Sequence, residues 1–316
     1  MSTAESFIVN LEEVTVDTKT EIFTAIQLIY GIPSLAMLIM CFILIFFGKN
    51  YGNSFYFLVR FDLLTNICVY LNTWIAIRLE MHPNTVFILK AIESALPGSL
   101  TIFKYIPYFF FHMHFWTSAL LTAHRLSSVL FIYKYEAFWS SWRNRIIMLI
   151  IIFICSHLPK YLWTGWLFEV YIVNDALICY NFPDALKDAY KVVGFFSIVY
   201  AITNLTMGLL TACLVSKKLG SKSTNNVSRK LTRVAISYSA AYFFELLWSV
   251  INSVNSYLNF LPDSIVEIDI NLLVFASDGF TLSLPYFLLA FDVNVKNDLF
   301  RKTKTSTIAT AVAISI

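Results

Sequence analysis

Long apolar stretches recur along this chain and are separated by short polar segments. An α-helix rises ~1.5 Å per residue, so about 20 apolar residues cross the ~30 Å hydrocarbon core of a bilayer. Seven stretches satisfy this length and predict an all-α membrane protein, a seven-transmembrane helix bundle. The predicted spans are residues 22–48, 54–77, 98–132, 146–168, 192–216, 234–257 and 270–291.

The spans differ in how sharply their ends are defined. The first carries no charge between Glu21 and Lys49, whereas the second holds Arg60 and Asp62 near its first end. The second and fourth spans are the least certain in length and charge of the seven, and a chain with six spans would lack one of them. Between the second and third spans, Val86 to Leu96 fits a short helix at the membrane interface.

An odd number of spans places the two termini on opposite sides of the membrane. Cytoplasmic loops carry an excess of lysine and arginine, so the basic residues decide the orientation. With residues 1–21 outside, 16 of the 23 basic residues lie on the cytoplasmic side, and Glu12, Glu13 and Asp17 agree with that choice. The prediction is an extracellular N-terminal segment, 1–21, and a cytoplasmic tail, 292–316.

Composition excludes a water-soluble domain, because 58% of the residues are hydrophobic and only 14% are charged. The first 20 residues are polar and acidic, so no cleavable signal peptide is expected and the first span must direct the chain to the membrane. Of five cysteines, only Cys179 lies outside the apolar runs. A single external cysteine cannot form an intrachain bridge, so no disulfide framework is predicted.

Two acidic residues fall deep inside predicted spans. Glu245 lies ~18 Å along its helix from Arg233, and Asp278 lies ~13 Å from Asp269. An ionisable group at that depth costs at least ~2.5 kcal/mol and faces the bundle interior. Two interpretations stay open: a ligand site, ion site or internal switch, or a structural hydrogen bond from a protonated acid.

Other chemistry is not indicated. His112 and His114 point ~200° apart on a helix, so they do not share a metal. The seventh span has no lysine for a retinal Schiff base, and the Gly-x-Gly-Asp and Gly-x-Ser-Gly motifs of intramembrane proteases are missing. We therefore expect no metal, no cofactor, no nucleic-acid partner and no enzymatic activity.

The third span ends at a charged residue beside the membrane surface. Tyr105 to Ala123 carries no Asp, Glu, Lys or Arg, and Arg125 follows next to His124. An arginine at this depth is either an anchor that reaches the headgroups or a switch residue.

The exit of the seventh span combines a kink with an amphipathic segment. Pro285 lacks a backbone donor and predicts a kink near Tyr286. Phe291, Val295 and Leu299 recur every four positions. This spacing fits a short interfacial helix, with the basic side chains Lys296, Arg301 and Lys302 toward the headgroups.

Two segments, HRLSSVLFIYKYEAFW at the third span and LSLPYFLLAFDVNVKNDL at the seventh, resemble the nematode serpentine chemoreceptors of class gamma. The matching residues are Arg125, Ser127, Ser128, Tyr135, Trp139, Pro285, Tyr286, Phe291, Asp292, Asn294 and Val295. The chain departs from the family pattern at His124, where asparagine is expected, and at Ile132, where proline is expected.

This resemblance implies a G-protein-coupled chemosensory receptor in the plasma or sensory-cilium membrane, with a small environmental or pheromone-like ligand and a heterotrimeric G protein as partners. We expect an outward-facing cavity among spans three, five, six and seven, lined by Tyr108, His112, Tyr200, Tyr242, Glu245 and Asp278. The expected switch residues are Arg125, Ser127, Ser128, Pro285 and Tyr286. No acid precedes Arg125, so a local ion-pair lock is not expected. Ligand contact would expose Arg125 and the basic loop 217–233 to the G protein.

An alternative is a transporter or ion channel that uses Glu245 and Asp278 as proton or cation sites. The chain shows no internal repeat, and its predicted number of spans is odd. Both observations weigh against a transporter built from inverted halves. The ligand and any dimerisation stay open at this point.

Overall fold

The computed structural model of the chain describes residues 7–13, 16–131, 134–162, 166–218, 226–266 and 268–300. The predicted tail beyond residue 300, including Arg301 and Lys302, and the middle of the basic loop 217–233 lie outside the described residues.

Helices dominate the described part of the chain, with one small sheet. The elements in chain order are β1 (Phe7–Asn10), α1 (Thr18–Phe47), α2 (Ser54–Thr73), α3 (Val86–Ala95), α4 (Ser99–Leu130), α5 (Tyr135–Ser140), α6 (Trp142–His157), β2 (Phe168–Val173), β3 (Ala176–Asn181), α7 (Pro183–Lys218), α8 (Asn226–Leu258), α9 (Asp263–Val266), α10 (Asp269–Thr281) and α11 (Leu284–Phe291). Residues 293–300 form a further helix.

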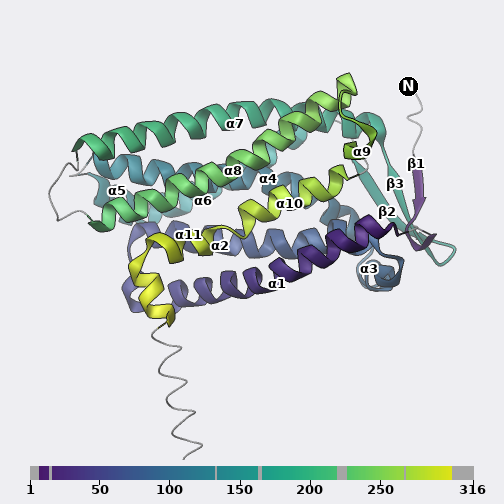
Figure 1. Ribbon diagram of the computed structural model, residues 1–316, viewed down its shortest axis with the longest axis horizontal. Helices are drawn as coiled ribbons and strands as arrows, with labels where there is room; N and C mark the ends of the chain where they lie inside the picture. The colour runs from purple at the N-terminus through teal and green to yellow at the C-terminus, as the bar shows by residue number, and fades with distance from the viewer. Residues whose placement is uncertain are drawn as a thin grey trace, which may run out of the picture.

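Six helical stretches have the length and hydropathy to cross a membrane alone, and they are Thr18–Phe47, Ser54–Met81, Trp142–Leu162, Pro183–Leu214, Thr232–Leu258 and Asp269–Phe291. The seventh is α4, which meets the same criterion together with the segment Pro83–Ala95, from which it bends by 103°. In Figure 1 the long helices run side by side along the bundle, and α4 packs against α2, α6, α7 and α8. The predicted fold class, a helical seven-span membrane bundle, is confirmed.

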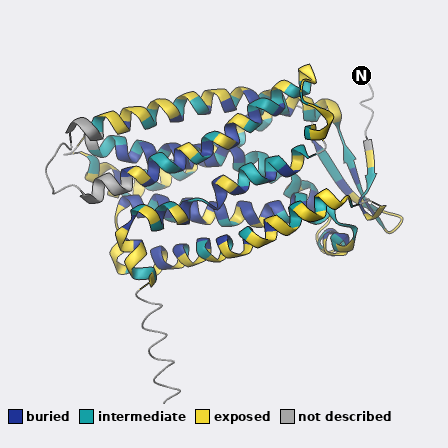
Figure 2. Cartoon of the chain, viewed as in Figure 1, coloured by how far each residue is buried: buried dark blue, intermediate teal, exposed yellow. Residues whose placement is uncertain are grey.

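The outer faces of the bundle are apolar. Figure 2 shows exposed residues along the outward sides of the long helices. Many of these are large aliphatic or aromatic side chains, among them Ile29, Ile32, Ile150, Phe153, Phe195, Ile202 and Leu209. Exposed apolar side chains on this scale mark a surface that contacts lipid rather than water.

The bend between α3 and α4 is built around one buried carboxylate. Glu93 Oε1 accepts a hydrogen bond from the Gly98 backbone N–H at 2.5 Å, and Glu93 Oε2 accepts from the Leu100 N–H at 3.0 Å. The first amides of a helix have no partner within the helix and favour negative charge, so Glu93 serves as their acceptor. Gly98 adopts φ 82°, a backbone conformation that favours glycine.

The second helix continues beyond the end predicted from sequence. After α2, a π-helical turn over Trp74–Arg78 and a 3₁₀ turn over Leu79–Met81 keep the chain helical. The predicted span stopped at Ile77 because Arg78 is charged, but in the structure Arg78 is buried and its charge is paired.

A three-stranded antiparallel sheet, which the sequence analysis did not anticipate, lies at one end of the bundle (Figure 1). Its strand order is β1-β3-β2. Asn174 and Asp175 join β2 to β3 with φ values of 49° and 64°, and two consecutive residues of positive φ are typical of a type I′ hairpin turn. Residues 169–191 lie between the fourth and fifth predicted spans, and the sequence analysis assigned no element there. The reason is that only six residues form each of β2 and β3, which is too short for a clear local pattern.

The sheet packs over α3 and the start of α4. The buried apolar residues of this region form one cluster, namely Leu11, Val86, Leu89, Leu100, Val170, Leu177 and Cys179. Lys90 on α3 forms ion pairs with Glu12 and Asp175, which ties the hairpin to α3. This layer covers one end of the bundle.

The helix over residues 293–300 carries the apolar stripe that was expected to lie on the membrane. In the structure this stripe faces the interior of the protein. Val295 is fully buried, and Phe291 and Leu299 pack against the main bundle core. The large apolar side chains that this segment exposes are Val293 and Phe300. Protein therefore covers Phe291, Val295 and Leu299, the apolar stripe of this segment.

Candidate ligand site and transmembrane polar network

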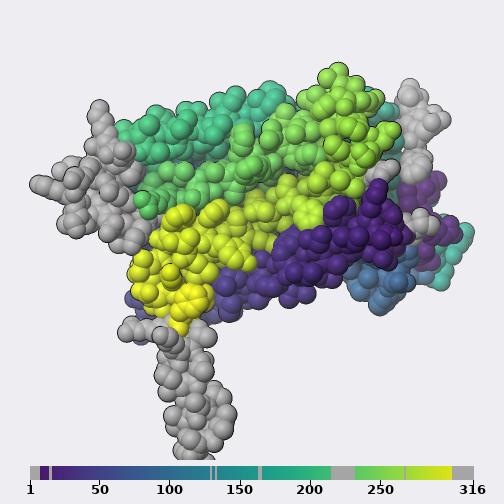
Figure 3. All heavy atoms as spheres, viewed as in Figure 1, coloured from purple at the N-terminus to yellow at the C-terminus, as the bar shows by residue number. Residues whose placement is uncertain are grey.

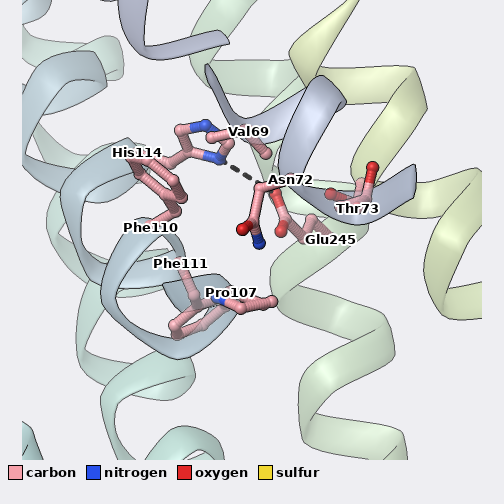
Figure 4. A pocket seen from close by; sticks show the side chains of 9 residues that line it. Val69, Asn72, Thr73, Pro107, Phe110, Phe111, His114 and Glu245 are labelled. Carbon is pink, nitrogen blue, oxygen red and sulfur yellow. Dashed lines mark ion pairs between the residues drawn. The ribbon is translucent and has the colours of Figure 1, made fainter. Parts of the chain in front are cut away.

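A small cavity lies in the bundle among α2, α4, α8 and α10 (Figure 4). Its volume is about 30 Å³, and it is lined by Val69, Asn72, Thr73, Pro107, Phe110, Phe111, His114, Glu245 and Ser277. Water needs ~10–15 Å³ on this measure, whereas ligand pockets have ~300–1,000 Å³. In this conformation the cavity has room for water but not for an organic ligand.

The cavity wall carries polar atoms without protein partners. Glu245 Oε2 lies 4.0 Å from His114 Nδ1, and both side chains are buried. Glu245 Oε2, both ring nitrogens of His114 and Asn72 Oδ1 have no hydrogen-bond partner within the described residues. Buried polar atoms are normally paired, so these atoms form a ready set of partners for a polar group.

The predicted cavity residues separate into different environments. His112 Nδ1 lies 2.9 Å from Tyr200 OH, on the side of α4 that faces α7. Tyr242 OH donates to the Phe111 backbone oxygen at 3.0 Å and therefore braces α8 against α4. Tyr108 packs in a separate apolar cluster with Leu167, at the start of the β2–β3 hairpin.

In the structure Glu245 and His114 line the cavity, whereas His112 contacts Tyr200. The two histidines do point in different directions, as their spacing requires, but the sequence could not show which one faces the cavity. No group of three or more His, Cys, Asp or Glu side chains is suited to hold a metal in the described part of the chain.

Asp278 on α10 is the centre of a second buried network, which joins three helices. Arg78 Nη2 donates to both carboxylate oxygens of Asp278, at 2.5 and 2.6 Å, and Tyr30 OH donates to Oδ2 at 2.5 Å. The Arg78 guanidinium also lies 4.9 Å from the ring centroids of Tyr70 and Trp74. Charged hydrogen bonds and cation–π contacts are strong away from water, so this network holds α1, α2 and α10 together.

Arg78 is the main site residue that the sequence analysis missed. The second predicted span ended at Ile77, which left Arg78 in the segment that follows the span. A buried charge requires a partner, so the lone Asp278 was itself a signal that a basic residue should lie nearby.

The seventh span is broken in the middle. α10 ends at Thr281 and α11 starts at Leu284, with Pro285 in its first turn. Below the break, Tyr286 OH lies 2.8 Å from Ser34 Oγ on α1. The predicted kink near Tyr286 therefore corresponds to a change of helix, and α1 contacts both halves.

Arg125 is buried at the other end of the bundle, near the end of α4. Its guanidinium lies 3.8 Å from the centroid of the Phe55 ring, and its Nε and Nη2 have no hydrogen-bond partner among the described residues. His124 beside it contacts Ser54 Oγ at 2.9 Å and Tyr135 OH at 2.8 Å. The Arg125 side chain is therefore packed inside the protein rather than extended toward its surface.

The predicted serines near Arg125 have different partners. Ser127 Oγ accepts a hydrogen bond from Trp139 Nε1 at 2.8 Å, whereas Ser128 Oγ donates to the Arg125 backbone oxygen at 2.7 Å. On α2, the Tyr56 hydroxyl donates a hydrogen bond to Asp292 Oδ2 at 2.6 Å. This last bond links α2 to the end of α11.

Comparison with known proteins shows the family to which this chain belongs. A family model described as Srg family chemoreceptor matches residues 24–299. The chain belongs to the Srg family. Serpentine receptor class gamma-47 of Caenorhabditis elegans is 31% identical over 306 residues, which cover 95% of this chain and 97% of that protein. Serpentine receptor class gamma-53 of the same organism is 26% identical over 281 residues, covering 87% of this chain and 90% of that protein.

The resemblance seen in the two motifs is thereby confirmed over nearly the whole length. This Srg chain is a multi-pass integral membrane protein of the serpentine chemoreceptor class. Family membership points to a receptor rather than an enzyme.

Proposed function

We propose that this Srg protein is a chemosensory receptor of the plasma or sensory-cilium membrane, which binds a small environmental or pheromone-like ligand and activates a heterotrimeric G protein. The ligand's polar group meets Glu245, His114 and Asn72, which line one cavity and carry unpaired polar atoms. Because this cavity is only about 30 Å³, ligand binding requires α2, α4, α8 and α10 to move apart.

The observation that carries this proposal is the position of Ser277 and Asp278 on α10. Ser277 lines the cavity, and the adjacent Asp278 is bonded to Arg78 and Tyr30. A ligand that displaces α10 at Ser277 must therefore disturb the network at Asp278. The break after Thr281 lies one turn further on and converts that shift into a movement of α11.

The far end of α11 is connected to the region around Arg125. Tyr56 holds Asp292, and its neighbour Phe55 covers the Arg125 guanidinium. Movement of α11 breaks the Tyr56–Asp292 bond and uncovers Arg125 for the G protein, which is a rearrangement of packed helices between two states.

The test is nucleotide exchange on a purified heterotrimeric G protein, added to membranes that contain the receptor. An extract of nematode-conditioned medium serves as the source of ligand. We expect the extract to stimulate exchange, Arg125→Ala to abolish the stimulation, and Glu245→Gln to raise the half-maximal extract concentration. The expected increase is about fivefold to tenfold, because one hydrogen bond between the carboxyl group and the ligand's polar group is lost or weakened.

Glu169→Gln is the matched control for Glu245→Gln. It makes the same chemical change on the β2–β3 hairpin, where the Glu169 side chain accepts a hydrogen bond from Tyr171 OH, and it should leave the response unchanged. The mechanism is wrong if stimulated exchange survives both Arg125→Ala and Tyr286→Ala at normal surface expression. An ionic current carried by the receptor alone would favour the transporter or channel instead.

A further inference from the structure

A second, larger cavity lies on the outside of the bundle, between α1 and the broken seventh span. Its volume is about 370 Å³, and it is lined by Tyr30, Phe275, Asp278, Gly279, Leu282, Ser283, Tyr286 and Phe287. Figure 3 shows α1 and α10–α11 side by side on the face toward the viewer. This volume lies within the ~300–1,000 Å³ of ligand pockets, unlike that of the central cavity. We call this feature the α1–α10 groove.

The groove opens toward lipid. On α1, Ile26 and Ile29 are exposed, and Tyr286 and Gly279 are exposed on the other wall. These residues belong to membrane-spanning helices, so a molecule in the groove arrives through the bilayer.

The hydroxyl groups on the two sides of the groove already donate their protons in hydrogen bonds within the protein. Ser34 Oγ donates to the Tyr30 backbone oxygen at 2.6 Å, so its contact of 2.8 Å with Tyr286 requires Tyr286 OH to be the donor. Tyr30 OH donates to Asp278. Both tyrosine oxygens therefore keep lone pairs that can accept, but no proton that can be donated.

The other donor groups that line the groove are also hydrogen-bonded within the protein. Ser283 Oγ donates to the Phe280 backbone oxygen at 2.7 Å. The backbone N–H groups of Leu282, Tyr286 and Phe287 are hydrogen-bonded within the chain. The lining thus offers acceptors and no free donor.

We propose that the α1–α10 groove binds an uncharged, lipid-soluble alcohol, with its apolar chain along Phe275, Leu282 and Phe287 and its hydroxyl donating to Tyr30 or Tyr286. A head that only accepts, such as an ether or ester, finds no donor here. A carboxylate would in addition lie beside Asp278, and an ammonium group is expensive to bring into hydrocarbon. This site is separate from the central cavity and does not depend on the proposed signalling function.

Gly279 provides a way to fill the groove without disturbing its wall. A Cβ atom added at Gly279 meets no other atom within 4 Å, and the same holds for Gly208 on α7. A leucine at either position replaces a glycine inside a helix and is sterically tolerated at Cβ. Only Gly279→Leu places its side chain in the groove.

The test is photolabelling of the purified full-length receptor in phospholipid nanodiscs, with a diazirine-bearing long-chain primary alcohol. We expect saturable labelling of peptides that contain Tyr30 or residues 275–287, competed by unlabelled dodecanol. The methyl ether of the same probe should label these peptides about fivefold to tenfold less, because it lacks the donor.

Gly279→Leu should reduce the labelling by a similar factor, whereas Gly208→Leu should leave it unchanged. Two results overturn the proposal: equal labelling by the alcohol and its ether, or labelling that Gly279→Leu leaves intact. Because the readout is binding, a receptor that labels as expected but fails to activate a G protein refutes only the proposed function.

Discussion

At the scale of single residues, the informative features are charges inside the membrane. Glu245 and Asp278 were recognisable from sequence, because each interrupts a long uncharged run. The side chains that face them were not, since Arg78 lies 200 positions from Asp278 and His114 lies on another helix from Glu245. Helical periodicity gives the face of a residue, but which faces meet is decided by the packing of the bundle.

The Arg78–Asp278 pair leads to a stability prediction. Arg78→Met should destabilise the receptor by about 3–5 kcal/mol, because it leaves the Asp278 carboxylate buried without its cation. The double variant Arg78→Met with Asp278→Leu should recover most of this loss. Thermal unfolding in detergent measures both. Equal melting temperatures for the single and double variants would show that the buried charge is not the source of the loss.

At the scale of elements, the membrane helices were predictable and the outer sheet was not. Long apolar runs predict membrane helices directly, because the backbone N–H and C=O groups of a segment in lipid must be hydrogen-bonded within that segment. The strands are short, and β1 pairs with a hairpin about 170 residues away, as in Val9 opposite Cys179. Such pairing leaves little trace in local patterns.

The sheet also determines the reactivity of Cys179. Burial raises the pKa of the Cys179 thiol to about 11, and Glu80 adds to this effect while Lys104 opposes it. Only the thiolate reacts, so at pH 8 the reactive fraction is about a hundredfold lower than for a thiol of pKa 9.0. We expect slow labelling by a membrane-impermeant maleimide, and faster labelling when residues 1–10 are deleted to remove β1.

Cys179→Ser provides the background for this measurement, because Cys68 and Cys213 are exposed on the membrane helices. The predicted pH dependence has a definite sign. The labelling rate should keep rising as the pH increases from 8 toward 11, instead of levelling off near pH 9. Rapid labelling of the intact chain at pH 7 would contradict the buried position of Cys179.

At the scale of the whole molecule, the distribution of basic residues predicts the orientation. The count of 16 basic residues on one face predicts that the covering sheet lies on the extracellular side and Arg125 on the cytoplasmic side. An N-terminal tag should be detected by antibody on intact cells, and a C-terminal tag only after permeabilisation. Detection of both tags on intact cells would contradict the seven-span topology.

The pairing of β1 with β3 has a consequence for biosynthesis. Residues 7–10 leave the ribosome long before residues 176–181, and α1, α2, α4 and α6 are made in between. At ~5–20 residues per second, the first strand waits roughly ten to thirty seconds for its partner. If the N-terminus is extracellular, as the basic residues predict, the unpaired edge of this strand meets chaperones of the secretory pathway during that interval. A nascent chain stalled before residue 176 should then be retained and degraded there.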